Sequence, residues 1–196
     1  MLEFRNNKGI VSGIIRKSNK SDIIDINNIL KDVFGADLTD RNCCYRETVE
    51  HSIKDRFYVF EEADTHRVIA CTGLTKVKHG YEVDWTGTMK EYQGFGIMHK
   101  LFDIMLKDKH KSKIYCSAWR VPAAEHANLH NILTAYNFKL KDKSVKEHSY
   151  LWDKPCFCTT GDCIKTCPFH KKTMPSSCAC WEDLYVRNKI TSGKQS

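Results

Sequence analysis

A glycine-rich turn that leads directly into a helix constrains the fold of this 196-residue chain more than any other feature. The turn is Gly94-Phe95-Gly96, and residues 97–105 after it place apolar side chains along one helical face. Before it, residues 81–89 are predicted to form a β-strand. The first amides of a helix lack internal partners, and the helix dipole adds about half a positive charge there. The sequence therefore predicts a strand–turn–helix unit whose backbone can hold a phosphate.

The residues after the turn exclude two kinds of phosphate site. A P-loop requires Gly-Lys followed by Ser or Thr, whereas this chain continues with Ile97-Met98-His99. A dinucleotide-binding turn requires a third glycine at position 99, which His99 occupies. By itself, Gly-x-Gly is also compatible with a tight turn that binds no ligand. The ligand therefore has to be inferred from the rest of the sequence.

The hydrophobic pattern predicts strands and helices in a definite order. The expected strands are residues 11–16, 57–60, 68–77, 81–89, 113–119 and 149–152, and the expected helices are residues 23–34, 97–105 and 127–136. Asn19 or Ser21 is expected to cap the first helix and Gly35 to end it, while Gly87 indicates a bulge within its strand. This order predicts an α/β (α+β) fold, in which helices flank a mixed, mostly antiparallel sheet.

The segment at residues 90–97 resembles the coenzyme A signature of the GNAT superfamily of N-acetyltransferases, Gln/Arg-x-x-Gly-x-Gly/Ala. The order of elements over residues 11–152 is also similar to that of the superfamily. The resemblance implies acetyl-CoA as cosubstrate, its pyrophosphate bound by the amides of the turn, and direct transfer of the acetyl group to a primary amine. The positions it assigns to cofactor binding are Thr88, Gln93, Gly94, Phe95, Gly96, Ile97 and Met98. Met98 departs from the usual Gly or Ala, so its side chain must point away from the ligand.

The resemblance also indicates where a catalytic base should lie. Members of the superfamily often use a carboxylate on the strand before the turn. Strand alternation places Glu82, Asp84, Thr86 and Thr88 on one face of that strand. Asp84 and Glu82 are therefore the candidate bases, with Asp84 nearer the expected thioester. The alternative is that both carboxylates lie on an ordinary solvent-facing side of the strand.

A general acid and a covalent nucleophile have no clear candidates. Relatives often carry a tyrosine on the fourth helix, but the matching region holds Ile132 and Leu133, and Tyr136 is out of register. Cys116, within a strand, could accept an acyl group, although a lone cysteine there is more often a small buried apolar residue. We interpret Cys116 and the Cys43-Cys44 pair as structural.

Six of the ten cysteines cluster near the C-terminus, which places a boundary near residue 152. The prediction is a GNAT-like domain at residues 1–152 and a cysteine-rich tail at residues 153–196. The candidate metal ligands are Cys156, Cys158, Cys163, Cys167, His170, Cys178 and Cys180. Soft ligands at this density predict zinc, as one ion with spare thiols or two sharing a thiolate, with an iron–sulfur cluster or disulfides as alternatives.

Composition and charge bound the remaining possibilities. The N-terminus lacks the apolar core of a signal peptide, and no stretch approaches the ~20 apolar residues needed to cross a bilayer. We therefore expect a cytoplasmic protein that has no membrane partner and keeps its cysteines reduced. The net charge of +7 is spread along the chain and forms no basic stripe in the sequence.

Two alternative functions stay open at this point. One is a non-catalytic protein with a GNAT-like fold, which binds CoA or nothing and acts through its zinc module. The other is a modifier of nucleic acid, or of a protein bound to nucleic acid, with the tail as its docking element. The acceptor has no recognisable signature in the sequence.

Overall fold

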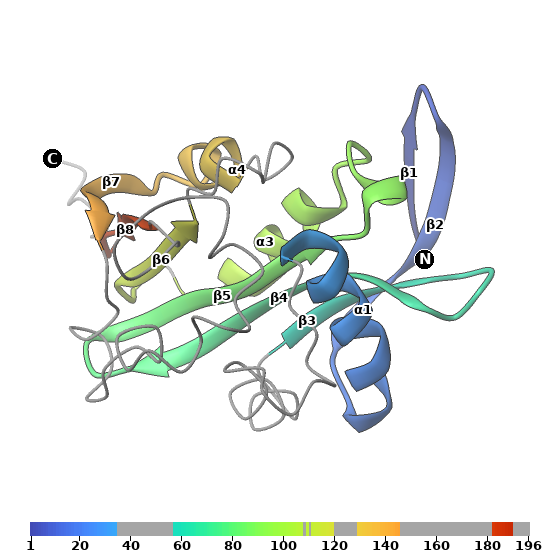
Figure 1. Cartoon of the computed structure of the whole chain (residues 1–196), viewed down its shortest axis with the longest axis horizontal. Helices are drawn as coiled ribbons and strands as arrows, with labels where there is room; N and C mark the ends of the chain where they lie inside the picture. Colours follow the sequence, from blue (N-terminus) through green and yellow to red (C-terminus); the bar gives the residue numbers. More distant parts are fainter. Residues whose placement is uncertain (35–56, 108, 110, 120–128, 146–181, 190–196) are drawn as a thin grey trace, which may run out of the picture.

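A computed structural model describes residues 1–34, 57–107, 109, 111–119, 129–145 and 182–189 (Figure 1). It confirms a mixed, mostly antiparallel sheet flanked by helices, with strand order β1-β2-β3-β4-β5-β6-β8-β7. The strands are β1 (Leu2–Asn6), β2 (Gly9–Lys17), β3 (Phe57–Glu62), β4 (Val68–Val77), β5 (Gly80–Thr88), β6 (Ile114–Trp119), β7 (Lys139–Val145) and β8 (Glu182–Arg187), and the helical segments are η1 (Lys20–Asp22), α1 (Ile23–Phe34), η2 (Lys90–Tyr92), α3 (Ile97–Leu106) and α4 (Leu129–Ala135). Within these ranges, no helix is long and apolar enough to span a membrane.

Strands β5 and β6 form the one parallel pair among the described strands, and each has an antiparallel neighbour on its other side. Strand β5 pairs with β4 along most of its length, but with β6 only from Tyr81 opposite Ile114 to Val83 opposite Cys116. All other neighbouring strands run antiparallel. The crossover that a parallel pair requires is supplied by α3, which connects β5 to β6.

The first helix begins as its sequence predicts. Asn19 caps η1 by accepting a hydrogen bond from the Ser21 amide, and the Asp22 side chain accepts one from the Asn19 amide to complete a capping box. Ile26, Ile29 and Leu30 of α1 are fully buried, as the helical spacing of apolar residues requires. Gly35, the predicted stop, lies outside the described residues.

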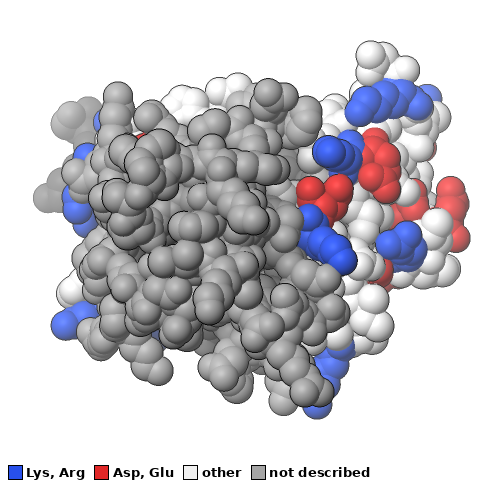
Figure 2. Space-filling model, in the orientation of Figure 1, with Lys and Arg blue, Asp and Glu red and all other residues white. Residues whose placement is uncertain are grey.

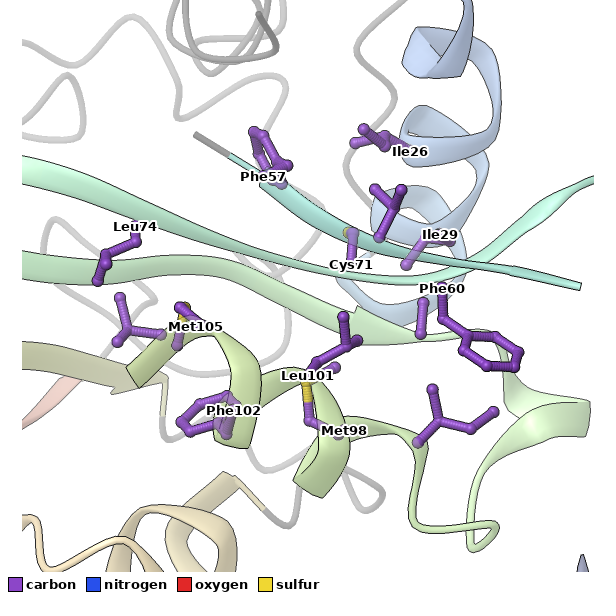
Figure 3. Packing of buried hydrophobic residues seen from close by; sticks show 14 of the residues in the cluster. Ile26, Ile29, Phe57, Phe60, Cys71, Leu74, Met98, Leu101, Phe102 and Met105 are labelled. Atoms are coloured by element: carbon purple, nitrogen blue, oxygen red, sulfur yellow. The ribbon is translucent and has the colours of Figure 1, made fainter. Parts of the chain in front are cut away.

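The core fills both faces of the sheet (Figure 3). Figure 3 shows Ile26 and Ile29 of α1 on one side of β3 and β4, and Leu101, Phe102 and Met105 of α3 on the other. Burying a large apolar side chain stabilises a fold by about 1.5–3 kcal/mol relative to exposure. The two helices therefore fix the central strands from opposite sides, and the turn before α3 is held by the core beneath it.

Helix α4 is attached to the rest of the fold by hydrogen bonds at each end. His130 lies in hydrogen-bond contact with the hydroxyl of Tyr185 on β8. At the other end, the Tyr136 hydroxyl donates to the His99 carbonyl and to Asp103 Oδ1, the latter at 2.8 Å. Helix α4 thus joins the β6–β8–β7 part of the sheet to α3.

Three strands were not predicted from the sequence. β1 forms a hairpin with β2 that projects from the body of the molecule (Figure 1). β7 is an edge strand rich in lysine, and lysines at an exposed edge discourage further strand pairing. Because of these lysines, its sequence lacks a clear alternation of apolar residues. The strand expected at residues 149–152 lies outside the described residues.

Strand β8 lies within the segment predicted to be the cysteine-rich tail. We assigned residues 153–196 to the tail, yet Glu182–Arg187 pair with both β6 and β7 inside the main sheet. Val145 at the end of β7 lies opposite Glu182 at the start of β8. Residues 146–181, which include all six clustered cysteines, therefore connect two strands that pair with each other in the sheet. The boundary near residue 152 lies outside the described residues and stays a prediction.

A partly buried ion-pair group joins β2, η1 and β3. The Arg16 guanidinium donates to both Asp22 oxygens at 2.7 and 2.8 Å, and to Glu61 Oε2 at 2.7 Å. Burial by itself would raise the pKa of Asp22, but the hydrogen bonds from Arg16 and from the Asn19 amide hold that pKa below its usual value. Asp22 is 5% exposed, so its charge depends on these partners.

We expect Asp22→Asn to lower the free energy of unfolding by about 2 kcal/mol at pH 7, because it breaks a buried pair and half the capping box. A carboxyl whose pKa is lowered by folding stabilises above its unfolded pKa of about 3.9, and this contribution is lost as the pH falls through the folded value. Urea denaturation at pH 7 and at lower pH measures the difference. An equal difference between the two proteins at pH 7 and below pH 3 would contradict this assignment.

Candidate functional site

The glycine-rich turn takes the shape predicted from its sequence. Gly94 and Gly96 have φ angles of +88° and +82°, in the left-handed region that favours glycine. Gly96 is the N-cap of α3, and a Cβ built on it would meet no atom of the described residues within 4 Å. Within the described part of the chain, the side of the turn that faces away from the core is therefore open.

Three hydrogen bonds hold the turn in place. The Gln93 side chain donates to the Thr88 carbonyl at 3.0 Å, and Lys8 Nζ donates to the Gln93 carbonyl at 3.3 Å. Asp32, near the end of α1, accepts from the Lys90 amide at 2.8 Å. The side chain of Gln93, which we predicted to bind the cofactor, thus stabilises the turn itself. Thr88 contributes its carbonyl to the same arrangement.

The backbone amides of residues 94–99 have no hydrogen-bond acceptor among the described residues. No side chain caps α3, and its first turn carries no acidic residue. Phe95, Ile97 and Met98 turn their side chains into the core, where each is at most 8% exposed. Met98, the residue that departs from the superfamily pattern, therefore leaves the outer side of the turn clear (Figure 3). The result is a helix N-terminus with free donors and a positive dipole end.

Strand β5 carries a bulge at Trp85 and Thr86, near the predicted position at Gly87. The register moves from Gly73 opposite Asp84 to Cys71 opposite Gly87, so β5 has one residue more than β4 across this step. Trp85 has a φ of +46°, which is unusual for a large side chain. Gly87 predicted a bulge in this strand, whereas a period-two pattern does not reveal which residues form it or how they turn.

The bulge separates the four polar residues that we expected on one face. The hydroxyl of Thr86 hydrogen-bonds the hydroxyl of Thr72. The Thr72 hydroxyl lies 3.7 Å from Met105 Sδ on α3, so both threonines face that helix. A Cβ on Gly87 would instead meet Ile29 of α1, which places Gly87 on the opposite face. The prediction of one shared face is therefore wrong. Glu82 and Asp84 stay together on the α1 side, and Thr86 and Thr88 lie on the α3 side.

The two candidate carboxylates differ in their surroundings. Asp84 is half-buried, and its Oδ2 accepts a hydrogen bond from Thr75 at 2.7 Å. Its Oδ1 would lie 1.9 Å from a Cβ on Gly73, so this carboxylate occupies space that only a glycine leaves free. Glu82 is 3% exposed and sits where β5 still pairs with β6. Thr75 and Gly73 support Asp84 but could not be identified from sequence, because they belong to the neighbouring strand.

β5 and β6 separate just at Asp84. Their last paired residues are Val83 and Cys116, although β5 continues to Thr88 and β6 to Trp119. Beyond this point β5 keeps pairing with β4, and β6 with β8. The central sheet therefore opens between two parallel strands, and β5 runs from this opening into the glycine-rich turn.

The remaining candidates have structural surroundings. Burial and the hydrogen bond to Asp103 raise the pKa of Tyr136, whose hydroxyl joins α4 to α3. Burial likewise raises the pKa of the Cys71 thiol, which donates to the Trp85 carbonyl at the bulge. Cys116 is 1% exposed, beside the opening of the sheet. Cys43 and Cys44 lie outside the described residues.

The seven predicted metal ligands also lie outside the described residues. In the described ranges, no three His, Cys, Asp or Glu side chains are arranged to hold a metal ion. Zinc binding therefore stays a prediction from the cysteine spacing.

Comparison with known proteins matches this architecture to one family of structures. No family model and no curated protein matches the sequence. Among solved structures, a GNAT-family acetyltransferase from Bacillus cereus ATCC 10987 aligns at 13% identity with a TM-score of 0.58, over 92% of this chain and 99% of its own. The chain has the GNAT fold.

Two further structures with this fold are informative. The ribosomal-protein-S18-alanine N-acetyltransferase of Escherichia coli aligns at 8% identity with a TM-score of 0.59, over 94% of this chain and 99% of its own. Rv2747 from Mycobacterium tuberculosis, solved in complex with CoA, aligns at 14% identity with a TM-score of 0.55, over 88% and 97%. The chain spans 45% of a longer matching structure from Pyrococcus horikoshii. At these identities the likeness establishes the GNAT fold.

Proposed function

We propose that this protein is an N-acetyltransferase that moves an acetyl group from acetyl-CoA to a primary amine by direct transfer. The observation that carries the proposal is the opening between β5 and β6, which leads into a helix N-terminus whose amides have no acceptor among the described residues. Structures with this fold include acetyltransferases, and one structure with this fold, Rv2747, was solved with CoA. The fold and the two halves of the site support the same reaction.

The donor half of the reaction would use the glycine-rich turn. A pyrophosphate placed over Gly94 and Gly96 would accept hydrogen bonds from the amides at the start of α3 and interact favourably with the helix dipole. Both glycines are exposed, so the backbone can approach the anion closely. Lys8 of the β1–β2 turn donates to the Gln93 carbonyl, and exposed His99 lies in the first turn of α3, so both add polar groups nearby. The thioester would then extend into the opening of the sheet.

The acceptor half would use Asp84 as the base. Asp84 is the first residue of β5 beyond its pairing with β6, whereas Glu82 lies within the paired part. The carboxylate would take a proton from the ammonium group, directly or through water, so that the neutral amine attacks the thioester carbonyl carbon. The tetrahedral intermediate would collapse by breaking the carbon–sulfur bond, giving the amide and the CoA thiolate, which then takes up a proton. The hydrogen bond from Thr75 would orient Asp84 for this step.

We also propose that residues 146–181 bind zinc through cysteine and histidine side chains. This connection contains the seven candidate ligands and few large apolar residues, so it cannot fold on a core of its own. Its base is closed by the pairing of Val145 with Glu182, which brings its ends together. A metal ion would supply the remaining order.

We expect Gly96→Glu to abolish the thermal stabilisation of the protein by acetyl-CoA, because the new carboxylate would lie where the pyrophosphate is bound. Gly96→Ala is the matched control. It imposes the same left-handed strain, about 1–2 kcal/mol, without adding a charge. Both variants should have similarly lowered melting temperatures, and the Ala variant should still bind the cofactor. Wild-type stabilisation of the Glu variant by acetyl-CoA would refute the pyrophosphate site.

Asp84→Asn should lower kcat for acetyl transfer about 100-fold or more, since the amide keeps the shape of the side chain but cannot accept a proton. The rise of kcat/KM with pH should weaken at the same time. Release of free CoA thiol across a panel of amines measures the rate. Glu82→Gln, tested in parallel, should have a smaller effect. If Glu82→Gln alone slows turnover, Glu82 is the base, and full activity of both variants would contradict a carboxylate mechanism.

Elemental analysis of protein purified without chelators should find one or two zinc ions per chain. Because zinc would order the segment between β7 and β8, chelation should lower the melting temperature of the whole domain. Replacing Cys163 and Cys167 by serine should reduce the zinc content, whereas replacing the buried Cys71 should leave it unchanged. Zinc-free protein with an unaltered melting temperature would contradict this proposal.

A further inference from the structure

Lysines that are far apart in the sequence gather at one end of the sheet. This basic end consists of residues 76–79 at the end of β4 and in the turn after it, the described residues of 107–113 between α3 and β6, 139–142 at the start of β7, and 186–189 at and after the end of β8. Strand pairing brings the four stretches together, because Val77 lies opposite Gly80, Ile114 opposite Arg187 and Lys139 opposite Val186. The basic residues concerned are Lys76, Lys78, Lys107, Lys109, Lys111, Lys113, Lys139, Lys141, Arg187 and Lys189.

The charge of the chain is concentrated at this end. The four stretches contain ten Lys and Arg against two Asp, Asp108 and Asp142, for a formal net charge of +8. The rest of the chain contains 21 Lys and Arg against 22 Asp and Glu, for a net charge of −1. The positive charge of the whole chain, +7, therefore comes from the basic end. In the linear sequence this concentration is not visible.

The lysine side chains face solvent: Lys109 and Lys113 are half-exposed, and the other seven are exposed. Arg187 is half-exposed, with its Nη1 buried. Figure 1 shows β7, β8 and the turn between β4 and β5 on the left of the molecule. In the same view, Figure 2 shows blue side chains on the left rim, and red and blue side chains next to one another on the right. The lysines of the basic end are thus open to a partner, and its four stretches contain two aspartates, Asp108 and Asp142, against ten basic residues.

The backbone beneath these charges is well held. The Tyr81 amide donates to the Lys113 carbonyl at 3.0 Å, and a Cβ on Gly80 would lie 2.0 Å from the same carbonyl oxygen. Lys109 Nζ lies 4.7 Å from the centroid of the Tyr81 ring, and Lys113 Nζ lies 5.1 Å from that of Tyr115. These cation–π contacts fix two of the ammonium groups against the sheet. The charges therefore have a defined arrangement before any partner binds.

We propose that the basic end binds the phosphate backbone of a nucleic-acid duplex. Five neighbouring strands, β4, β5, β6, β8 and β7, end or begin there, and at about 4.8 Å between strands they span roughly 19 Å. A surface of this width can contact several phosphates along a duplex, which carries one charge per about 1.7 Å of its axis. Nine of the ten groups are lysines, which bind phosphates as point charges and read no base edges.

The chemistry of the surface favours a duplex over other polyanionic partners. A protein interface usually offers exposed aromatic or aliphatic anchors, and a membrane-binding surface offers apolar side chains to insert. Single-stranded nucleic acid requires exposed rings for stacking. Among the described residues of the basic end, Leu140, at 38% exposure, is the large apolar side chain that reaches solvent. Of the two rings beside the basic end, Tyr115 is 7% exposed, and Tyr81 is half-exposed with Lys109 over its face. Charge without apolar contacts is typical of binding to a phosphate backbone.

The basic end lies at the opposite end of β5 and β6 from the proposed acetyl-transfer site. β5 begins at Gly80 in the basic end and reaches the sheet opening at Asp84 and the glycine-rich turn at its other end. A bound duplex would therefore leave the cofactor site accessible. It would hold the enzyme near acceptors carried on nucleic acid or on proteins attached to it. The binding itself does not depend on the proposed catalytic function.

The test uses the full chain and a fluorescently labelled DNA duplex of about 20 base pairs, with an RNA duplex of the same sequence as a second probe. Binding is followed by anisotropy between about 50 and 200 mM salt. Lys111→Gln/Lys139→Gln removes two charges of the basic end, and Lys20→Gln/Lys31→Gln removes two exposed charges elsewhere. We expect the first variant to reduce the slope of log K against log salt by about 2, and the control to leave it nearly unchanged.

Both variants should keep the wild-type melting temperature and its shift with acetyl-CoA, which separates this proposal from the proposed acetyl transfer. A similar salt slope for both duplexes would support recognition of the backbone. Absence of binding to either duplex at about 50 mM salt would overturn the proposal, as would equal losses in the two variants. Tighter binding to polyglutamate or to phosphatidylserine vesicles would assign the surface to an acidic protein or a membrane instead.

Discussion

The short parallel pairing of β5 with β6 is the constraint on which the rest of the site depends. Three residue pairs join the two halves of the sheet, and beyond Val83 and Cys116 each strand follows its outer neighbour. The bulge at Trp85 bends β5 at this point and redirects its side chains. As a result, Asp84 lies at the edge of the opening, and β5 leads into the glycine-rich turn. The packing of α1 and α3 on opposite faces keeps both parts in place.

Local sequence predicted the parts of the molecule in which neighbouring residues decide the structure. The Asn19 cap, the buried face of α1 and the left-handed glycines before α3 all follow from short-range rules. The faces of β5 could not be predicted, because the bulge that sends Thr86 to the α3 side depends on the pairing with β4. Thr75 and Gly73, which position Asp84, are likewise known only once the strands are aligned.

The long-range organisation of the C-terminal region was equally hidden. β8 follows a long cysteine-rich segment and pairs with β6 and β7, so part of the predicted tail is a strand of the main sheet. The same pairing gathers lysines of the four stretches of the basic end. Glu182, where the cysteine-rich connection rejoins the sheet, lies opposite Trp119 at the far end of β6. The connection thus leaves the sheet at the end where β5 and β6 separate, and the basic end lies at the other.

Titration of isotopically labelled protein with CoA, followed by amide NMR spectroscopy, tests most directly whether the helix N-terminus binds the cofactor. The amides of residues 94–99 have no acceptor among the described residues, so a bound pyrophosphate should produce the largest shift changes there. Changes at Asp84 and Cys116 should accompany them if the thiol enters the opening of the sheet. Saturable shifts centred on Gly94 and Gly96 are the predicted result. CoA binding that leaves these amides unperturbed would contradict the account.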